Sequence, residues 1–437
     1  MTGSLSPTRR GALTAALAGG ALCAAPTALA PAHAAPAERT SPAVTDPVAP
    51  SPRSAGPARP LPAEEAAERA VAATRALLTH FRAETDPDML IERFPRQEED
   101  PEFTYVWPLS QARAAVTELI AAQDAARRPA EVEDLDLDAA DAALIRAQEH
   151  YWYPEGGTTG LPGYTAATDS EQGAHGDFFY DDNDWIALLE IEQHLLTGGA
   201  SGNLDRAGEL LELFRSGEST DPDLASPGGI EWTQGDWNQD RNTVSTFPSA
   251  KVALRWFQLT GEEEALADAL RWMDWGRETL LSPETGLYWD NIKPDGEIDR
   301  THWAYNQGVP LGCEALAHVL TGDDAHRDRA LALCEAVVDN YRPYEDGGEL
   351  DRQPLQFTAI LLSNLLMAQA LLGAEVPGRQ ITEAYAQRLW ANRRDPETDL
   401  VTGSRETDEG THLLDQAGFA RSLALASLPR ERWVHLS

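Results

Sequence analysis

The sequence has little sulfur and little positive charge. Its 437 residues include three cysteines, and 35 Lys or Arg side chains stand against 71 Asp or Glu, which gives a formal net charge of −36. An excess of negative charge this large repels phosphate backbones and anionic lipids, which argues against nucleic acid and membrane surfaces as partners. The apolar share of 42% still suffices for one large domain or two ordinary ones.

Signatures of several other chemistries are also missing. The ten histidines show no HxxH or HExxH spacing, and no EF-hand-like loop occurs. There is neither a Gly-rich phosphate loop nor the Gly-x-Ser-x-Gly elbow of many serine hydrolases. We therefore expect neither a metal ion nor a cofactor.

The N-terminus has the composition of a processed segment. Arg9-Arg10 precede an Ala-rich apolar run that ends near Leu29, and Ala32-His33-Ala34 offers a cleavage site. Residues 1–34 are therefore predicted to be an export signal, and the paired arginines fit the twin-arginine type.

After this segment the composition changes twice. Residues 35–62 are rich in Pro, Ala and Ser, which is typical of a disordered linker. Residues 63–437 remain as a single domain. No segment in it has 18 or more apolar residues without charge, so we expect a secreted, soluble and monomeric mature chain with no stable membrane insertion.

A short pattern recurs along the domain, in which an apolar helix ends in Leu-Thr-Gly and a second Ala/Leu-rich helix follows. It occurs at Leu196-Thr197-Gly198, Leu259-Thr260-Gly261 and Leu320-Thr321-Gly322, at intervals of 63 and 61 residues. Gly suits the left-handed residue that ends a helix. A repeat of this length with two helices indicates an array of helical hairpins.

The 3.6-residue period of apolar residues predicts about twelve helices and few strands. Six hairpins of this kind close into a ring of six inner and six outer helices, an all-α (α/α)6 barrel; the alternative is an open solenoid. The predicted spans are 64–84, 108–124, 138–153, 183–197, 203–215, 246–260, 262–281, 309–320, 325–341, 354–373, 380–392 and 413–427.

Polar clusters precede the first helix of successive hairpins. One contains Asp181, Asp182 and Asn183, and Asn242 follows Asp181 by 61 residues. Asn306 follows Asn242 by 64 residues, again about one repeat. Pro248 and Pro310 would then occupy first helical turns. Equivalent positions in a ring lie at the same end of the barrel, so these clusters are predicted to surround one mouth.

Two adjacent aspartates surrounded by aromatic residues are typical of a site that cleaves sugars, because such a site uses a pair of carboxyls. An ordinary helix cap is the alternative for Asp181 and Asp182, because Asp is favoured at helix starts. Asp184 adds a third acid. It either holds the helix start or tunes the pKa values of the pair, but we favour a solvated surface position for it.

Aromatic and amide side chains in the same loops are candidates for contact with a sugar. We assign Trp185, Trp256, Trp272 and Trp275 to the core because they fall on predicted helices, and Trp289 to a loop. The predicted substrate-binding residues are Tyr180, Asn183, Trp232, Trp237, Asn242, Asp290, Trp303, Tyr305, Asn306 and Gln307.

These motifs resemble glycoside hydrolase family 76, the α-1,6-mannanases. The matching segments occur in the same order over roughly residues 65–427. They are Tyr-Asp-Asp-Asn-x-Trp at 180–185, Gly-Gly-Ile-x-Trp at 228–232, Asn-Thr-Val-Ser at 242–245 and Trp-x-Tyr-Asn-Gln-Gly at 303–308. One segment departs from the family pattern: Gln-Phe-Thr-Ala stands at 356–359, where a Phe-Lys-Gly-like stretch is expected.

The resemblance implies an (α/α)6 barrel that hydrolyses α-1,6-linked mannose chains with retention. Asp181 would be the nucleophile, and Asp182 the general acid/base with a pKa raised by its negative neighbour. A retaining enzyme needs its two carboxyls about 5–5.5 Å apart. Neighbours in sequence do not face each other along a regular helix, so the pair is expected at an irregular helix start.

Two further functions stay open. A related fungal branch of the resemblance implies transglycosylation with the same covalent chemistry, and the third reading is a glycan-binding barrel without catalysis. The mature chain also keeps Cys313 and Cys334 on either side of a turn. An exported protein could join them in a disulfide, or they are two buried thiols.

Overall fold

The computed structural model describes residues 60–123, 135–168, 177–403 and 410–437, all within one compact unit of the chain. The predicted export signal (1–34) lies outside the described residues, as does all but the end of the predicted linker (35–62).

The described residues form twelve α-helices, which confirms the all-α class. Their bounds are α1 Ala63–His80, α2 Val106–Ala122, α3 Leu137–Glu149, α4 Tyr180–Leu196, α5 Leu204–Ser216, α6 Thr243–Thr260, α7 Glu263–Leu280, α8 Tyr305–Thr321, α9 Asp324–Tyr341, α10 Leu355–Leu372, α11 Gly378–Arg393 and α12 Leu413–Ser427. Two short 3₁₀ helices follow α9 and α12, namely η2 Glu349–Arg352 and η3 Arg430–His435.

The strands are two residues long and pair only near helix starts. Three sheets result, all antiparallel: β1 with β7, β2 with β3, and β4 with β5 and β6. Their bounds are β1 Arg93–Phe94, β2 Trp152–Tyr153, β3 Gly163–Tyr164, β4 Arg241–Asn242, β5 Asn291–Ile292, β6 Ile298–Asp299 and β7 Thr411–His412.

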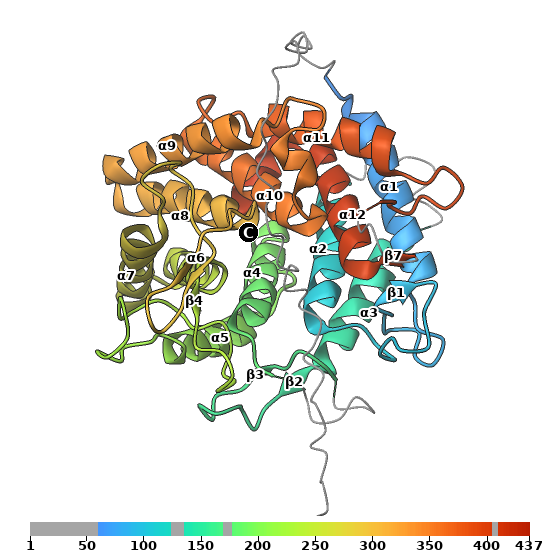
Figure 1. Cartoon of the computed structure of the whole chain (residues 1–437). Coiled ribbons are helices and arrows are strands. Elements are labelled where there is room, and N and C mark those ends of the chain that lie inside the picture. The colour runs from blue at the N-terminus through green and yellow to red at the C-terminus, as the bar shows by residue number, and fades with distance from the viewer. Residues whose placement is uncertain (1–59, 124–134, 169–176, 404–409) are drawn as a thin grey trace, which may run out of the picture. The chain divides into compact units, whose positions relative to one another are not determined.

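The even-numbered helices form a closed inner ring. Each packs against the next, and α12 returns to pack against α2 (Figure 1). The odd-numbered helices lie outside, each against its hairpin partner or against neighbouring inner helices. Six hairpins therefore make an (α/α)6 barrel, and the predicted closed ring, not the open solenoid, is what forms.

Four of the six inner helices, namely α2, α4, α6 and α8, begin earlier than predicted. α4 begins at Tyr180 and not at 183, and α6 and α8 begin at Thr243 and Tyr305. Pro248 and Pro310 are consequently inside helices, which corrects their predicted first-turn position. Each leaves the carbonyl four residues earlier without its helical partner, a loss confined to the opening turns.

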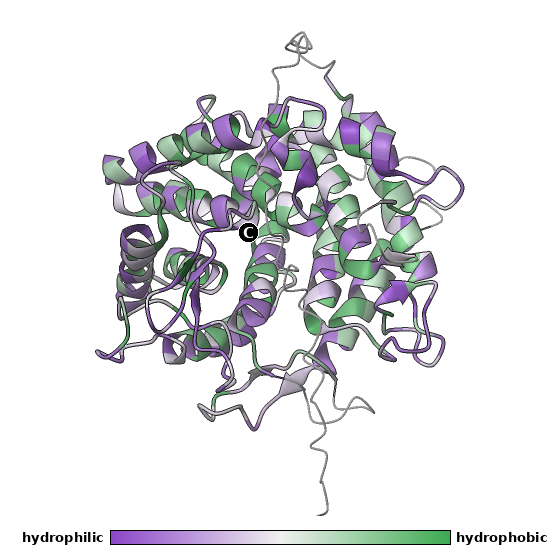
Figure 2. Cartoon of the chain, viewed as in Figure 1, coloured by the Kyte–Doolittle hydropathy of each residue, from purple (hydrophilic) through white to green (hydrophobic). Residues whose placement is uncertain are grey.

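Hydropathy follows the two layers. Outer helix α7 carries polar residues on its exposed side, whereas inner helix α10 is mostly apolar (Figure 2). By length and composition α10 is the one described helix that could cross a membrane, yet 72% of it is buried inside the protein. It packs between α8 and α12, which is the position of a core helix.

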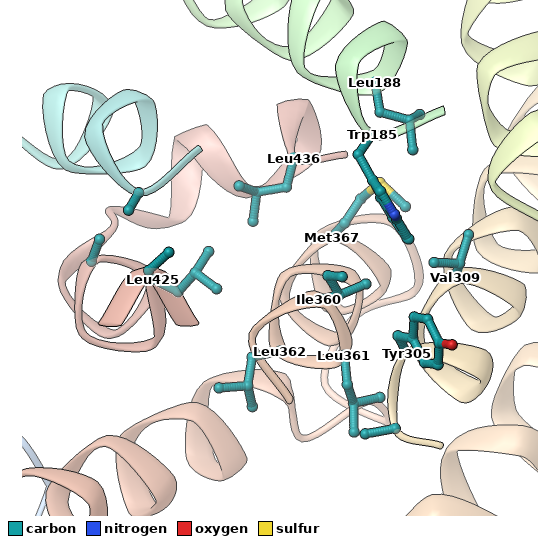
Figure 3. Packing of buried hydrophobic residues seen from close by; sticks show 14 of the residues in the cluster. Trp185, Leu188, Tyr305, Val309, Ile360, Leu361, Leu362, Met367, Leu425 and Leu436 are labelled. Carbon is teal, nitrogen blue, oxygen red and sulfur yellow. The ribbon is translucent and has the colours of Figure 1, made fainter. Parts of the chain in front are cut away.

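The C-terminal residues fill the barrel axis. Leu436 joins apolar side chains of the inner helices, among them Trp185, Val309 and Met367 (Figure 3). Arg255 of α6 donates to the carbonyls of Val434 at 2.9 Å and Leu436 at 2.7 Å. Because Arg255 lies late in α6, this segment occupies the end of the ring opposite to the helix starts.

The cysteines are two buried thiols. Cys313 and Cys334 are both free, and the thiol of Cys313 donates to the carbonyl of Phe247 at 3.3 Å. The disulfide alternative is therefore not what the structure shows.

A buried ion pair spans the seam where the ring closes. Arg421 of α12 donates to Glu118 Oε1 of α2 at 3.0 and 2.6 Å, and to Gln111 Oε1 at 2.7 Å. Both charged side chains are almost fully buried. The backbone of β7 pairs with β1 beside this seam, with His412 opposite Arg93.

Replacing Arg421 by Met should lower the free energy of unfolding by about 3–5 kcal/mol, because Glu118 keeps a buried charge without its partner. Denaturant unfolding followed by circular dichroism measures the change. The double variant Arg421→Met/Glu118→Leu removes both charges and should recover much of the loss. A double variant no more stable than the single one would contradict this role of the ion pair.

Candidate active site

The mouth of the barrel is formed where the six inner helices begin. The sheet of β4, β5 and β6 brings two loops together there, and the amide of Thr243 donates to the carbonyl of Asp290 at 2.8 Å. Asn242 is the residue before α6, and Asp290 immediately precedes β5. The predicted gathering of repeat-spaced polar clusters at one end is therefore observed.

Asp181 and Asp182 lie in the first turn of α4, as its second and third residues. This corrects the expectation of an irregular helix start, since the helix already begins at Tyr180. Neither aspartate caps the helix through its side chain, because Phe179 is the N-cap residue and makes no such bond. Their exposed fractions are 8% and 1%. The alternative in which these aspartates only cap the helix therefore does not explain why both carboxyls are buried.

Burial perturbs both carboxyls, to different extents. Loss of solvation raises the pKa of Asp181 to about 7, although hydrogen bonds from the Trp232 indole and from backbone amides favour its charged form. The pKa of Asp182 is raised well above its ordinary value by burial and then by the charge of Asp181. At neutral pH the pair therefore holds a proton, and Asp181 ionises first.

Asp290 is a third acid at the mouth. Burial raises its pKa to about 6, while hydrogen bonds from Asn306, Asn291 and Trp303 oppose the shift. Asn306 Nδ2 donates to Asp290 Oδ1 at 2.9 Å. The phenol of Tyr305 is buried in the negative field of Asp290 and Asp181. Asp290, Trp303, Tyr305 and Asn306 were predicted as substrate contacts, and the structure brings them together near the aspartate pair.

Several buried oxygen atoms here have no hydrogen-bond partner within the described part of the chain. They are Oδ1 of Asp181, Asn242 and Asn306, and Oγ of Ser245. A buried acceptor without a donor costs about 1–3 kcal/mol, so such atoms call for a ligand or for water. Because carboxylate and amide oxygens accept hydrogen bonds, a ligand rich in hydroxyl donors fits them.

Two aromatic clusters flank the polar centre. In the first, Tyr305 stacks on Phe357 with ring centroids 3.8 Å apart and an interplanar angle of 2°, and Trp303 meets Phe357 edge-on at 5.5 Å. In the second, Trp232 lies between Phe179 at 5.0 Å and Trp237 at 5.8 Å. Trp237 is 56% exposed, so its ring is open to a ligand.

Sequence reasoning missed two members of the first cluster. Phe357 lies in the first turn of α10, within the segment 356–359 that departs from the family pattern. Trp107 in the first turn of α2 stacks on it at 6.0 Å. Both residues lie in the first turn of an inner helix, as Asp181 does, and this shared position could have identified them from the sequence.

Two residues that were predicted to contact the substrate instead hold neighbouring loops in place. Asn183 accepts from the amide of Tyr164 at 2.7 Å and donates to its carbonyl at 3.0 Å. Gln307 does the same with the amide and carbonyl of Tyr288, at 2.7 and 2.9 Å. Gln416 of α12 accepts from the amide of Val401 at 2.8 Å. We call these three amides the loop clamps, because each ties the preceding loop to the start of an inner helix.

Tyr180 is buried, and its ring lies so close to Gly217 that a Cβ there would come within 2.5 Å of it, so its contact with a sugar stays a prediction. The prediction for Asp184 is corrected. Asp184 is not a solvated surface residue: it is fully buried and accepts from Ser249 Oγ at 2.9 and 3.2 Å. Burial raises its pKa well above the ordinary value, so it stays protonated beside the pair.

The assignment of four tryptophans to the core is confirmed for two. Trp185 and Trp272 are buried in the core, while Trp256 and Trp275 are only partly buried and pack against it. Trp289 is partly buried and lies under the Arg300 guanidinium, 5.3 Å from the ring centroid. Among the residues that the structure describes, no group of three or more His, Cys, Asp or Glu has the arrangement of a metal site.

A proton-holding pair of carboxyls between aromatic walls suits acid-assisted cleavage of glycosidic bonds, and the chain is a glycoside hydrolase. It belongs to glycosyl hydrolase family 76, which matches residues 66–391.

Known proteins with the same fold include several members of this family. The mannosidase Bt3792 of Bacteroides thetaiotaomicron is 19% identical with a TM-score of 0.71, over 84% of this chain and 99% of that one. The α-1,6-mannanase of Salegentibacter sp. HEL1_6, solved as an inactive variant with α-1,6-mannotriose, is 19% identical with a TM-score of 0.62, over 84% and 99%.

A curated relative covers a shorter stretch. The mannan endo-1,6-alpha-mannosidase DCW1 of Candida glabrata is 29% identical over 118 residues, which is 25% of this chain and 26% of that protein.

The buried pair should make stability depend on pH. Asp181 and Asp182 keep protons that the unfolded chain releases above its ordinary carboxyl pKa near 4, so stability falls as pH rises through this window. The variant Asp181→Asn/Asp182→Asn should lose less stability between pH 4.5 and 7.5, by about 1–4 kcal/mol. Denaturant unfolding at the two pH values measures this difference.

The matched control is Glu263→Gln/Glu264→Gln, which removes two adjacent but exposed acids from the first turn of α7. Its pH dependence should follow that of the unmodified protein. Equal pH dependence in all three proteins would show that the aspartates titrate normally.

Proposed function

We propose that the chain is an exported, retaining hydrolase of α-1,6-linked mannose chains. The observation that carries this proposal is the pair Asp181 and Asp182, buried together at the mouth and unequal in pKa. A retaining hydrolase needs one ionised and one protonated carboxyl at the same sugar.

The electrostatics favour Asp181 as the nucleophile. Its charge is stabilised by the Trp232 indole and by backbone amides at the start of α4, where the helix dipole also favours an anion. Asp182 has its charged form disfavoured by burial and by Asp181, so it retains the proton and acts as general acid.

The reaction then proceeds in two displacements. Asp181 attacks the anomeric carbon and forms a glycosyl ester, while Asp182 gives its proton to the departing glycosidic oxygen. Asp182, now a carboxylate, removes a proton from water, and that water attacks the same carbon and releases Asp181. Asp290 and Asn306 would accept hydrogen bonds from the hydroxyls of the bound sugar.

The substrate class is supported by the relatives. In the mannanase of Salegentibacter sp. HEL1_6, a variant with two consecutive aspartates changed to asparagine is described as inactive and binds α-1,6-mannotriose. The relative from Candida glabrata is described as a mannan endo-1,6-alpha-mannosidase. The adjacent aspartates of this chain fit the same chemistry.

Export is supported by the sequence of residues 1–34. The paired arginines, the Ala-rich apolar run and the Ala32-His33-Ala34 site are those of a cleaved signal, and a polymeric substrate outside the cell requires a secreted enzyme. We propose that the mature protein begins at Ala35 and acts as a monomer.

Changing either aspartate to asparagine should reduce kcat/KM on α-1,6-mannan by about a thousand-fold or more, because one asparagine cannot attack and the other cannot protonate. Reducing-end release from linear α-1,6-mannan measures activity. Glu263→Gln/Glu264→Gln should retain full activity. Proton NMR of the unmodified enzyme should show the α anomer as the first product.

Other outcomes would identify the alternatives. A β anomer as first product would contradict the roles of the pair. Transfer to an added sugar in preference to water would indicate a transglycosylase. Mannan binding without cleavage by the unmodified chain would indicate a glycan-binding barrel.

Trp237 should supply binding energy without taking part in catalysis, because its ring is exposed and lies outside the buried pair. Trp237→Ala should raise KM for mannan about three- to ten-fold, the equivalent of about 0.5–1.5 kcal/mol of aromatic contact, and leave kcat unchanged. The control is Val319→Ala, another exposed apolar side chain, at the far end of α8. A fall in kcat with constant KM would contradict this role.

A further inference from the structure

A second cavity opens beside the mouth. It has a volume of about 380 Å³, within the range of about 300–1,000 Å³ that is typical of small-ligand sites. The loop before α8, the end of α9 and η2 enclose it, and the aspartate pair is not part of its lining. Its walls are formed by Leu287, Thr301, His302, Trp303, Asn340, Tyr341, Glu349, Arg352 and Gln353.

Trp303 joins this cavity to the catalytic mouth. Its side chain donates a hydrogen bond to Asp290, whose charge in turn acts on Asp181, and the same residue lines the cavity. Trp303 and Asp290 therefore connect the lining of the cavity to the aspartate pair.

The cavity offers hydrogen bonds that the protein does not use. Gln353 is 8% exposed; its Oε1 accepts from the amide of Ala304 at 2.9 Å, which leaves the amide nitrogen to donate to a ligand. His302 Nε2 is buried and has no partner in the described part of the chain. Unpaired polar atoms in a cavity of this size indicate a polar ligand.

The charges of the cavity point to an uncharged ligand. Glu349 and Arg352 pair with each other at 3.3 Å, which balances their charges. Burial lowers the pKa of His302, so the imidazole is neutral at neutral pH. A neutral imidazole, an amide and the face of Trp303 together suit the hydroxyls and C–H surface of a sugar ring.

Buried residues line part of the cavity. Leu287 and Tyr341 are both buried, and the Tyr341 hydroxyl donates to the carbonyl of His302 at 3.1 Å. A glycan chain could not continue through these residues, so the cavity accepts a terminal sugar unit. Because the cavity extends toward the outer helix α9, it leads sideways from the mouth.

We propose that this cavity, which we name the side pocket, binds an uncharged sugar unit carried as a branch on the glycan that occupies the catalytic mouth. The inference rests on the proposed function for the main chain of that glycan. The side pocket would make the enzyme prefer a glycan backbone that carries a branch sugar next to Trp303 over an unbranched backbone.

The test compares a linear α-1,6-mannohexaose with the same backbone bearing one mannosyl branch on an internal sugar. His302→Ala should lower kcat/KM for the branched glycan by about three- to ten-fold, the effect of one lost hydrogen bond. The linear glycan should change by less than about two-fold. His302→Trp fills the side pocket and should lower kcat/KM for the branched glycan further.

The control is His194→Ala, a partly exposed histidine in the last turn of α4, far from the mouth. It should change neither substrate. Equal effects of the His302 variants on both glycans, or no effect on either, would overturn the side pocket as a branch site. An effect on the linear glycan alone would show that the pocket holds a chain end instead and would equally overturn it.

A binding measurement separates this inference from the proposed function. If the unmodified protein hydrolysed neither glycan, the proposed function would fail, but calorimetric titration with the linear hexaose and the branched glycan would still test the side pocket. Tighter binding of the branched glycan that is lost in His302→Ala supports the side pocket. Equal or absent binding of the two glycans refutes it.

Discussion

The fold depends on the closure of the inner ring, where α12 packs on α2 across a buried ion pair between Arg421 and Glu118. Closure makes every inner helix a neighbour of two others, and because an outer helix returns the chain after each inner one, all six begin at the same end. The catalytic mouth is a consequence of this arrangement, since the site residues come from helix starts and loops far apart in the sequence. The segment 430–437 fills the opposite end of the axis.

At the mouth, function and stability have opposite requirements. The proposed retaining mechanism needs a proton on one carboxyl and a charge on the other, and burial of both carboxyls at the start of α4 would meet that need. Burial and mutual repulsion raise both pKa values, which helps catalysis and disfavours the folded state at neutral pH. The protonated Asp184 beneath them avoids a further buried charge. The rest of the barrel must compensate, and its seam and loop clamps are among the interactions that do so.

Much of the architecture was readable in the sequence. The Leu-Thr-Gly repeat indicated the hairpins, and the spacing of Asp181, Asn242 and Asn306 placed three clusters at one end. The prediction was less good for individual side chains. Asn183 and Gln307 have the polar character of sugar ligands, yet both hold a neighbouring loop through its amide and carbonyl. A buried backbone needs such partners as much as a ligand does, and residue type cannot distinguish the two uses.

The sequence by itself determined the helical hairpins, the paired aspartates and the family, because periodicity and adjacent motifs are local properties of the chain. Only the tertiary structure decided which polar residues hold a neighbouring loop, that Asp184 is buried, and that Phe357 and Trp107 extend the aromatic wall. It also revealed the side pocket, whose walls come from separate segments between Leu287 and Gln353. The physical reason is that burial and cavities arise from the packing of distant segments, which no single stretch of sequence records.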